Sequence, residues 1–518
     1  MAPTYGYRLI KLQLPALLFF LLLSGRIAAQ QGILDSTFTF REGTVKTGAA
    51  LDAISKKTGY GFTYDSRLID TEKKTELTFS DTRLREILRS VVDSDSLLFS
   101  VIDKYIIISR AYRSPAPAAL ATAPQASGYI TGIVTDNETN DPLPFATLGL
   151  KRSGRGTVTN GNGEFGLKIT PEIFEDTLLI TYLGYIRREV PVKQSLGNDF
   201  TISMEKEFIS IPEIIIKNQV PQEIISRTRK AIPGNYGNTP SLMTGFYREG
   251  VLKKSELQTY SEAVIYIFKS SYTPTILGDQ IKVFKSRKIE NSDRSDTLAI
   301  RLKAGLNTCL ELDGAKNTFD FLTIEGSQDY SYRLSDIVTY DEESAYVIDF
   351  EQHEGIDQPL YKGTIYINTT DYAILHVDFE LNPKYIHKMK ESFIANSSHG
   401  FITWPLSVNY SVSYRQMDGR YFLSHVRGDL LFTSNKKRKL FKSQFKVFFE
   451  LAVTDIRTND VTRFERDELA PVHSIFSKTI KNYDPLFWGN QDFLRPEDNL
   501  LQALKNMNVK LQEFSEER

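Results

Sequence analysis

A chain of 518 residues is too long for one hydrophobic core, so about three domains are expected. The formal net charge of -1 gives no overall field that would favour nucleic acid or an anionic membrane. The single cysteine, Cys309, excludes a disulfide within the chain. We expect it to be a buried small side chain, because the sequence identifies no base that would activate a thiol nucleophile.

Residues 1–29 have the pattern of a secretory signal peptide. Arg8 and Lys11 precede an apolar segment at 12–23, and Ala29 ends a small-residue cleavage site. The apolar segment is shorter than the about 20 residues that a membrane-spanning helix needs. We therefore expect export, with retention as an uncleaved anchor as the alternative.

Residues 30–111 contain a weak repeat of strand, helix and strand, which predicts a small α/β domain. Apolar positions predict helices over about 47–57 and 82–92. Gly59 is expected to stop the first helix, and Asp81 to cap the second. We expect the two copies to share one sheet and to bury both helices against it.

Four stretches carry a resemblance for this segment: Ala49–Ile54, Thr58–Asp65, Leu84–Leu88 and Tyr105–Ser109. Their spacing and apolar pattern resemble the secretin and TonB-receptor short amino-terminal domain. The resemblance implies a periplasmic module that makes protein–protein contacts and often passes signals to a regulator in the inner membrane. A generic two-layer α/β domain is the alternative.

A linker rich in proline and alanine, residues 112–127, precedes a second domain at 128–215. Short alternating apolar runs between Pro, Gly, Asn and Asp clusters predict a small antiparallel sandwich there. Gly161 and Gly163 are expected to adopt positive φ in an Asn-Gly-Asn-Gly hairpin. Gly184 is expected to let two chain segments approach closely.

Five stretches of the second domain look like the carboxypeptidase regulatory-like domain: Gly132–Asp136, Pro142–Ala146, Gly156–Asn160, Gly163–Phe165 and Tyr182–Tyr185. The resemblance implies a seven-stranded, transthyretin-like sandwich. It also implies an accessory role, because in that family the domain has no catalytic residues of its own. The Asp/Asn-rich turn at 136–140 does not match an EF-hand spacing, so we expect a solvated turn there.

Residues 216–518 are expected to form a β-rich domain. A helix is predicted from Pro221, ended by Pro233-Gly234. Alternating patterns then predict strands, with hairpin turns at 370–371 and 418–419. The predicted strands are 242–249, 259–268, 345–350, 363–368, 373–380, 408–414, 421–427 and 446–452. They predict a large, curved antiparallel sheet that wraps a helix or an apolar groove.

An apolar stripe predicts a carboxyl-terminal helix at 496–514, which docks on the sheet or, alternatively, binds a partner or a membrane surface. Segments 246–249, 260–264 and 363–374 resemble an uncharacterised family of envelope proteins that carry the regulatory-like sandwich upstream. The last segment is also similar to the half-barrel of lipoprotein carriers, in which a curved sheet holds acyl chains.

The sequence contains no metalloprotease helix motif, P-loop, dinucleotide fingerprint or nucleophile elbow. The weak candidates for a binding site are Tyr247, Arg248 and Glu249, although a structural Arg248–Glu249 pair at a sheet edge is the favoured interpretation. His376 and Asp378 alternate on one strand and could supply two metal ligands. The sequence shows no clear third ligand, so we expect neither a metal nor a cofactor.

Together these patterns predict a multidomain, mainly β protein with a small α/β domain, a seven-stranded sandwich and a large curved sheet. We expect a non-enzymatic envelope protein, exported to the periplasm or outer membrane. Its expected partners are envelope proteins, such as a TonB-dependent transporter or an inner-membrane regulator, and not nucleic acid. Peripheral membrane association is also compatible with the apolar stripe of the predicted carboxyl-terminal helix. The sandwich is expected to be a spacer or an adhesion surface.

Two alternatives stay open. One is a hydrolase with an unrecognised active site in residues 236–472. The other is a TonB-dependent receptor-like outer-membrane protein, because both amino-terminal modules occur upstream of such barrels. The roughly 300 residues after position 215 are few for a plug and a barrel of about 22 strands.

Overall fold

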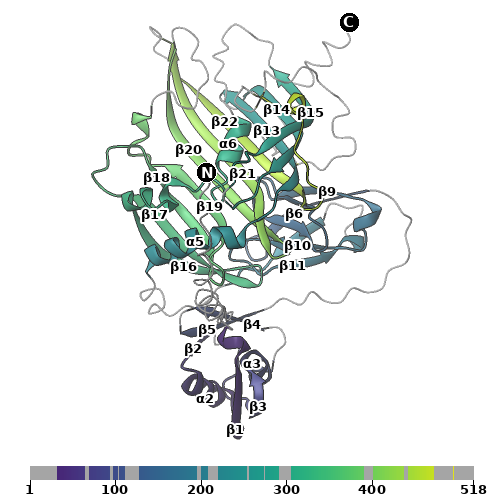
Figure 1. The fold of residues 1–518 in the computed structure, drawn as a ribbon, viewed down its shortest axis with the longest axis vertical. Helices are drawn as coiled ribbons and strands as arrows, with labels where there is room; N and C mark the ends of the chain where they lie inside the picture. Colours follow the sequence, from purple (N-terminus) through teal and green to yellow (C-terminus); the bar gives the residue numbers. More distant parts are fainter. Residues whose placement is uncertain are drawn as a thin grey trace, which may run out of the picture.

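The computed structural model describes most of the chain: residues 32–64, 69–93, 97–102, 104–110, 128–194, 200–207, 220–253, 256–273, 275–290, 305–389, 401–436, 442–471, 476 and 494. This part is mainly β and contains several sheets, which confirms the predicted fold class (Figure 1). The predicted signal peptide, linker and carboxyl-terminal helix lie outside the described residues. Within those residues, no helix has the length and apolar character needed to cross a membrane.

The amino-terminal unit has two small sheets and two helices. Its elements are β1 (Thr37–Lys46), α2 (Thr47–Thr58), β2 (Gly61–Tyr64), β3 (Lys74–Arg83), α3 (Leu84–Val92), β4 (Leu97–Ile102) and β5 (Tyr105–Arg110). Both predicted helices are present, and Gly59 caps α2 with a φ of 76°. The prediction that both copies share one sheet was wrong, because β1 pairs with β3 while β2, β5 and β4 form a second sheet. Asp81 does not cap α3, because pairing with β1 extends β3 to Arg83.

The second unit is a sandwich of seven strands. They are β6 (Gly128–Asp136), β7 (Thr147–Leu150), β8 (Gly156–Val158), β9 (Glu164–Ile169), β10 (Thr177–Thr181), β11 (Arg188–Pro191) and β12 (Phe200–Met204). One sheet has the order β11-β10-β7-β8 and the other β12-β6-β9. Both sheets bury side chains in one core, which includes Val134, Phe165 and Ile180. The sandwich is not wholly antiparallel, since β12 pairs parallel with β6.

One of the two glycine predictions in the sandwich was wrong. The Asn-Gly-Asn-Gly turn is not a hairpin, because β8 and β9 belong to different sheets, and of its two glycines Gly163 alone has a positive φ. The predicted close approach at Gly184 is confirmed, because its N–H donates to the Thr339 carbonyl oxygen at 2.7 Å and its carbonyl oxygen accepts from the Glu207 N–H at 2.9 Å. Another close approach is at Gly132, where a Cβ atom would lie 2.3 Å from the Phe200 carbonyl oxygen.

The third unit is built on an antiparallel sheet of ten described strands. Its elements are α5 (Pro221–Asn235), β13 (Ser241–Lys253), β14 (Glu256–Lys269), β15 (Gln280–Glu290), α6 (Gly305–Glu311), β16 (Tyr330–Tyr340), β17 (Glu343–Gln352), β18 (Tyr361–Asn368), β19 (Ile374–Leu381), β20 (Phe401–Met417), β21 (Arg420–Lys436) and β22 (Lys442–Arg457). The order is β15-β14-β13-β22-β21-β20-β19-β18-β17-β16. All eight predicted strands are present, and β15 and β16 were not predicted. The Asp418-Gly419 hairpin is confirmed, with φ values of 50° and 72°.

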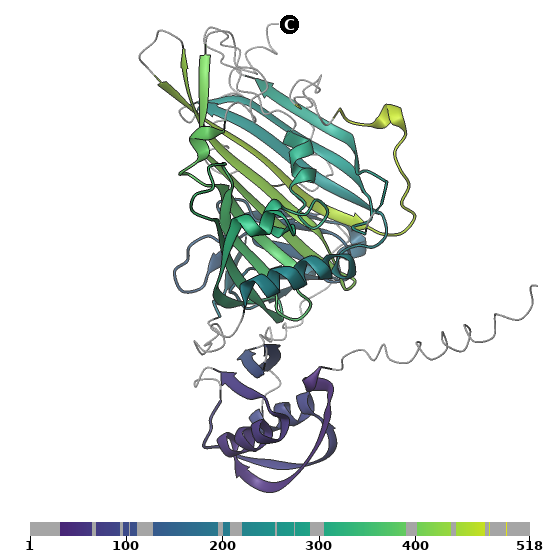
Figure 2. The same ribbon diagram turned by 60° about the vertical axis from the view of Figure 1, so that its left-hand side comes forward.

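The curved sheet wraps α5 and α6 on its concave side (Figure 2). Ile224 and Ile232 of α5 and Leu306 of α6 join one core with the inward-facing side chains of the strands. Cys309 lies in this core and is fully buried, as expected. Pro233 does not end α5, because the Tyr236 N–H donates to the Ile232 carbonyl oxygen and closes one more turn.

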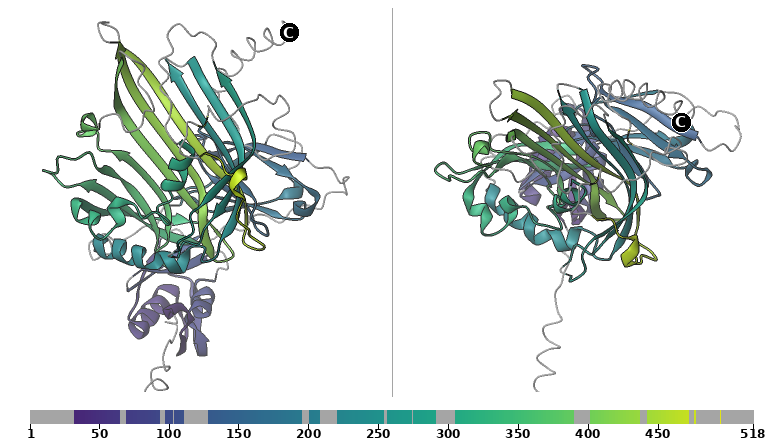
Figure 3. Two further views of the ribbon diagram at one scale, coloured as in Figure 1. Left: turned by 45° about the horizontal axis from the view of Figure 1, so that its top comes forward. Right: turned by 90° about the horizontal axis from the view of Figure 1, so that it is seen from above.

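The sandwich lies against the convex side of the same sheet (Figure 3). Val158 of β8 is buried with Phe246, Val264 and Ala452, which project from the convex face of β13, β14 and β22. The sandwich therefore packs directly on the sheet, and its expected role as a spacer or an adhesion surface stays a prediction.

Candidate functional site

A cleft of about 950 Å³ separates part of the sandwich from the convex face of the sheet. Phe145 and the turn at 181–183 form the sandwich wall, and strands β16 to β21 form the floor. This volume lies near the upper end of the ~300–1,000 Å³ that is usual for small-molecule sites. The cleft is therefore the candidate binding site of the described residues.

The strand pattern makes the floor of the cleft polar. Successive side chains of a strand point to opposite faces. On β19, Val377 and Phe379 are buried in the concave core, so His376, Asp378 and Glu380 face the cleft. The same alternation on β20 and β21 directs serine, asparagine, arginine and aspartate side chains to the cleft.

His376 links two strands at the centre of the floor. Its Nε2 atom lies 2.9 Å from Asp378 Oδ2, and its Nδ1 atom lies 2.8 Å from Ser413 Oγ. A ring that donates from Nε2 to the carboxylate would accept the Ser413 hydroxyl at Nδ1. Burial alone would raise the pKa of Asp378, but His376 and the Ser411 hydroxyl outweigh burial and lower it. The Asp378 side chain stays 58% exposed and accessible to a ligand.

Two tyrosines lie near Asp378, one from the sandwich and one from the sheet. Tyr182 comes from the sandwich, and Tyr366 comes from β18, with its ring centroid 5.6 Å from that of His376. Burial and then the nearby Asp378 raise the pKa of Tyr366 to about 12. Burial and Asp378 also raise the pKa of Tyr182. Both phenol groups therefore lie close to the same carboxylate.

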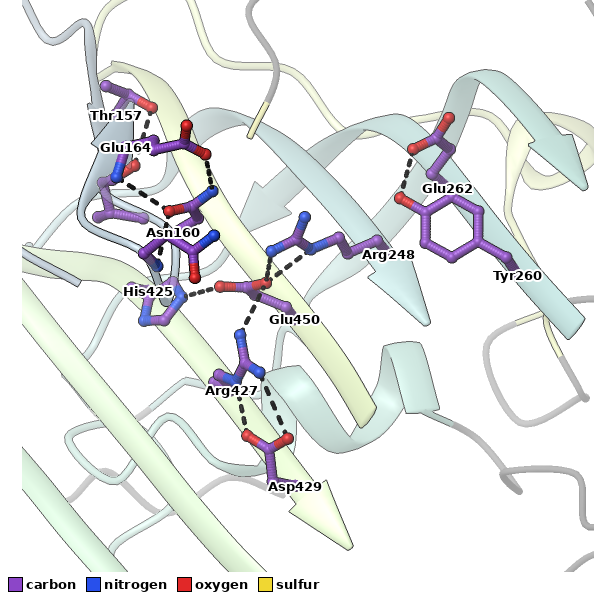
Figure 4. A network of polar contacts seen from close by, with 12 residues as sticks. Thr157, Asn160, Glu164, Arg248, Tyr260, Glu262, His425, Arg427, Asp429 and Glu450 are labelled. Atoms are coloured by element: carbon purple, nitrogen blue, oxygen red, sulfur yellow. Dashed lines mark hydrogen bonds and ion pairs between the residues drawn. The ribbon is translucent and has the colours of Figure 1, made fainter. Parts of the chain in front are cut away.

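A buried charge network adjoins the cleft under the sandwich (Figure 4). Glu450 Oε2 lies 2.6 Å from Arg248 Nη2 and 3.6 Å from Arg427 Nη1, and Glu450 Oε1 lies 2.8 Å from His425 Nε2. Burial would raise the pKa of Glu450, but Arg248, Arg427 and His425 more than compensate and lower it well below its usual range. Arg427 also binds Asp429 at 2.6 Å and so carries the network to the cleft floor.

Phe145 connects the sandwich to this network. Its ring stacks on His425 with centroids 5.2 Å apart, and the Arg427 guanidinium lies 5.1 Å from the ring centre. The φ of Phe145 is 62°, an unfavourable value for a bulky residue. Such strain persists where the surroundings hold the residue in place, and it is common at binding sites.

A second set of contacts fixes the sandwich at the far side of the cleft. Arg187 Nη1 donates to Asp341 Oδ1 at 2.8 Å, and Arg187 also pairs with Glu342. The Gly184 N–H donates to the Thr339 carbonyl oxygen at 2.7 Å. With anchors on both sides, the width of the cleft is set by the packing of two folded units.

The predicted site residues lie on β13, an interior strand and not an edge. Tyr247 and Glu249 share a hydrogen bond of 2.7 Å, while Arg248 points to the opposite face and pairs with Glu450. The expected Arg248–Glu249 pair was therefore wrong, because neighbouring residues of a strand face opposite sides. All three side chains are buried, and none lines the cleft. A binding role for them stays a prediction.

The sequence drew attention to His376 and Asp378 but missed Ser413, Tyr182 and Tyr366. The alternation of apolar and polar residues along each strand could have placed Ser413 and Tyr366 on the polar face of the sheet. The register that sets Ser413 opposite His376, and the docking that brings Tyr182 above the sheet, depend on tertiary structure. Among the described residues no cluster of three or more His, Cys, Asp or Glu side chains could hold a metal ion.

Residues 130–216 match the family model of the CarboxypepD_reg-like domain. This match confirms the resemblance predicted for the sandwich. No curated protein matches the chain.

Solved structures similar to the chain include a DUF1329 family protein from Desulfovibrio piger, with 10% identity over 48% of this chain and 99% of that one, at a TM-score of 0.21. An outer membrane lipoprotein-sorting protein domain from Vibrio parahaemolyticus is 13% identical over 47% and 93% of the two chains, at a TM-score of 0.19. Lipovitellin is 8% identical over 44% and 26%, at a TM-score of 0.22. TM-scores this low support no inference about this chain.

Proposed function

We propose that the chain is an exported, non-enzymatic binding protein of the cell envelope, and that the cleft between the sandwich and the sheet is its binding site. The observation that carries this proposal is the cleft itself, a space of about 950 Å³ between a polar floor on the sheet and a wall formed by the docked sandwich. The sandwich matches a regulatory-like family, which supports an accessory role without chemistry of its own. The signal-peptide pattern supports export.

The amino-terminal unit is proposed to contact a second envelope protein, either a TonB-dependent transporter or an inner-membrane regulator. The resemblance of residues 30–111 to the secretin and TonB-receptor module supports this role. In this arrangement one end of the chain binds a partner while the cleft binds a ligand. Nucleic acid is not a proposed ligand, because carboxylates outnumber cationic side chains in the cleft.

The proposal can be tested by filling the cleft. Asn409 is exposed on its floor, so Asn409→Trp should block it without disturbing the core. Glu354→Trp adds the same ring at an exposed turn outside the cleft and serves as the control. The immobilised full chain and the Glu354→Trp variant should retain a component of solubilised envelope that Asn409→Trp loses. Identical retention by all three proteins would refute the cleft as the binding site.

Location is tested by fractionation and carbonate extraction of membranes. A peripheral or periplasmic binding protein should come off the membrane. The alternative of an integral outer-membrane receptor predicts that the protein stays in the pellet.

A hydrolase is the second candidate, favoured by one observation. Ser413, His376 and Asp378 form a continuous hydroxyl–imidazole–carboxylate chain in the cleft. This candidate predicts turnover in a broad screen of esters, peptides and glycosides that is lost in Ser413→Ala. A wild-type chain without turnover, but with cleft-dependent retention, favours the binding protein.

A further inference from the structure

The charges of the cleft are largely paired with one another. Each cationic side chain that lines it lies beside a carboxylate, in the pairs Arg333–Asp349 at 2.6 Å, Lys362–Glu380 at 3.1 Å and Arg427–Asp429 at 2.6 Å. Five carboxylates and three cations line the cleft, which leaves a small negative excess with histidine neutral. A phosphorylated or otherwise polyanionic ligand would meet repulsion here.

The floor is also unsuited to acyl chains. A hydrocarbon over His376, Asp378 and Asn409 would remove water from polar groups without replacing their hydrogen bonds, which costs free energy. The apolar face of the sheet is the concave one, and it is occupied by α5 and α6. A lipid ligand is therefore disfavoured on both faces of the described sheet.

Most of the cleft floor does not offer an extended peptide the backbone groups that peptide-binding sheets commonly use. Peptides commonly bind sheets by adding a strand at an edge, where backbone N–H and C=O groups are unpaired. The cleft lies over β16 to β21, and of these strands only β16 is an edge of the described sheet; the others are hydrogen-bonded to a strand on both sides. Over β17 to β21, which form most of the floor, a peptide could use side-chain contacts alone, and only at β16 could it add a strand.

The remaining combination is two aromatic rings around groups that donate and accept hydrogen bonds. A sugar ring has an apolar face of C–H groups that packs on aromatic rings, and vicinal hydroxyls that pair with carboxylate, imidazole and amide groups. Tyr182 supplies a ring from the sandwich wall, and Tyr366 supplies one from the sheet. Asp378, with His376 and Asn409 nearby, supplies acceptors and donors on the floor. The volume is large enough for more than one sugar ring.

We infer that the cleft binds an uncharged oligosaccharide, with sugar rings packed against Tyr182 and Tyr366 and hydroxyls hydrogen-bonded to Asp378. This inference rests on the proposed binding function and names the ligand class of the same cleft. It differs from the hydrolase alternative in requiring no bond to break.

The test uses the full chain and a panel of soluble neutral polysaccharides, with heparin as an anionic comparison, by affinity gel electrophoresis and calorimetry. At least one neutral glycan should bind, and more tightly than heparin. Tyr366→Ala and Asp378→Asn should each weaken binding about tenfold or more, while Tyr366→Phe, which keeps the ring, should change it less than about threefold. Asp357→Asn alters an exposed carboxylate outside the cleft and should have no effect.

The outcomes separate this inference from the proposed function. If no neutral glycan binds, yet Asn409→Trp abolishes retention of an envelope protein or lipid, the ligand class is wrong and the cleft is still a binding site. If glycan binding survives Tyr366→Ala and Asp378→Asn, or if heparin binds more tightly, the inference is overturned. If neither a neutral polysaccharide nor any envelope component binds in a way that depends on the cleft, both the inference and the proposed function fail. Circular dichroism confirms that each variant is folded.

Discussion

Replacement of Arg248 by methionine should reveal the cost of an uncompensated charge inside the sheet. The Arg248 and Glu450 side chains are 1% and 0% exposed, and Nη2 and Oε2 lie 2.6 Å apart. Methionine fills similar space but removes one of the cations that hold Glu450 ionised. Breaking a buried pair from one side costs about 3–5 kcal/mol. Since Arg427 and His425 remain as partners of Glu450, we expect the lower end, about 3 kcal/mol.

The chain contains a matched control for this experiment. Arg333 and Asp349 also lie 2.6 Å apart, but their side chains are 75% and 33% exposed. Arg333→Met should cost less than about 1 kcal/mol, because water already solvates both charges. Urea unfolding followed by fluorescence and circular dichroism measures both variants. Equal losses for Arg248→Met and Arg333→Met would show that burial does not set the strength of these pairs.

The lowered pKa of Glu450 makes the free energy of unfolding depend on pH. The unfolded chain takes up a proton at this residue near the ordinary glutamate pKa of about 4.3, while the folded chain resists protonation to lower pH. The stabilisation is therefore complete above that pH and is lost as the pH falls below it. In Glu450→Gln the unfolding free energy should depend less on pH between about 3 and 5 than in the wild type. If the unfolding free energies of Glu450→Gln and the wild type changed equally with pH, Glu450 would not be the source of this pH dependence.

Three further substitutions or reactions test single features. Burial raises the pKa of the Cys309 thiol, so a thiol reagent should label it only after unfolding; fast labelling of the native chain would place it at the surface. Gly419→Ala should cost about 1 kcal/mol in urea unfolding because its φ is 72°, whereas Gly278→Ala, in open space with ordinary φ, should cost little. Phe145→Ala should speed hydrogen exchange around residues 140–147 by releasing the sandwich from His425; unchanged exchange would show that the ring does not hold this wall.

The strands of the large sheet were predictable where they lie in its interior. Eight segments with alternating apolar residues became β13, β14 and the strands from β17 to β22, because both neighbours and the concave core select the pattern. The two strands that were missed, β15 and β16, are the edges of the sheet. Edge strands often carry charged side chains, such as Lys282, Lys285 and Arg287 in β15, and these weaken the apolar signal.

The candidate site was predictable only in part. Local alternation placed His376 and Asp378 on one face of a strand. It could not supply Ser413, which lies 37 positions along the chain and meets His376 through the register of β19 and β20. It could not supply Tyr182 either, because the docking of the sandwich depends on contacts such as Phe145 with His425. These are long-range consequences of packing.

The same alternation produces both the cleft and the buried network. The convex face of the sheet carries charged side chains along β13, β22 and β21 beside the apolar Phe246, Val264 and Ala452, so the sandwich could cover the charged part only if the covered charges neutralised one another. Glu450 is surrounded by Arg248, Arg427 and His425, and Phe145 closes the group from above. Replacing buried ion pairs with apolar residues is often neutral or stabilising, so we expect this network to fix where the sandwich sits more than to add net stability. Because Arg427 also binds Asp429 on the cleft floor, Arg248→Met should disturb the cleft as well as the core, and ligand affinity should fall with stability.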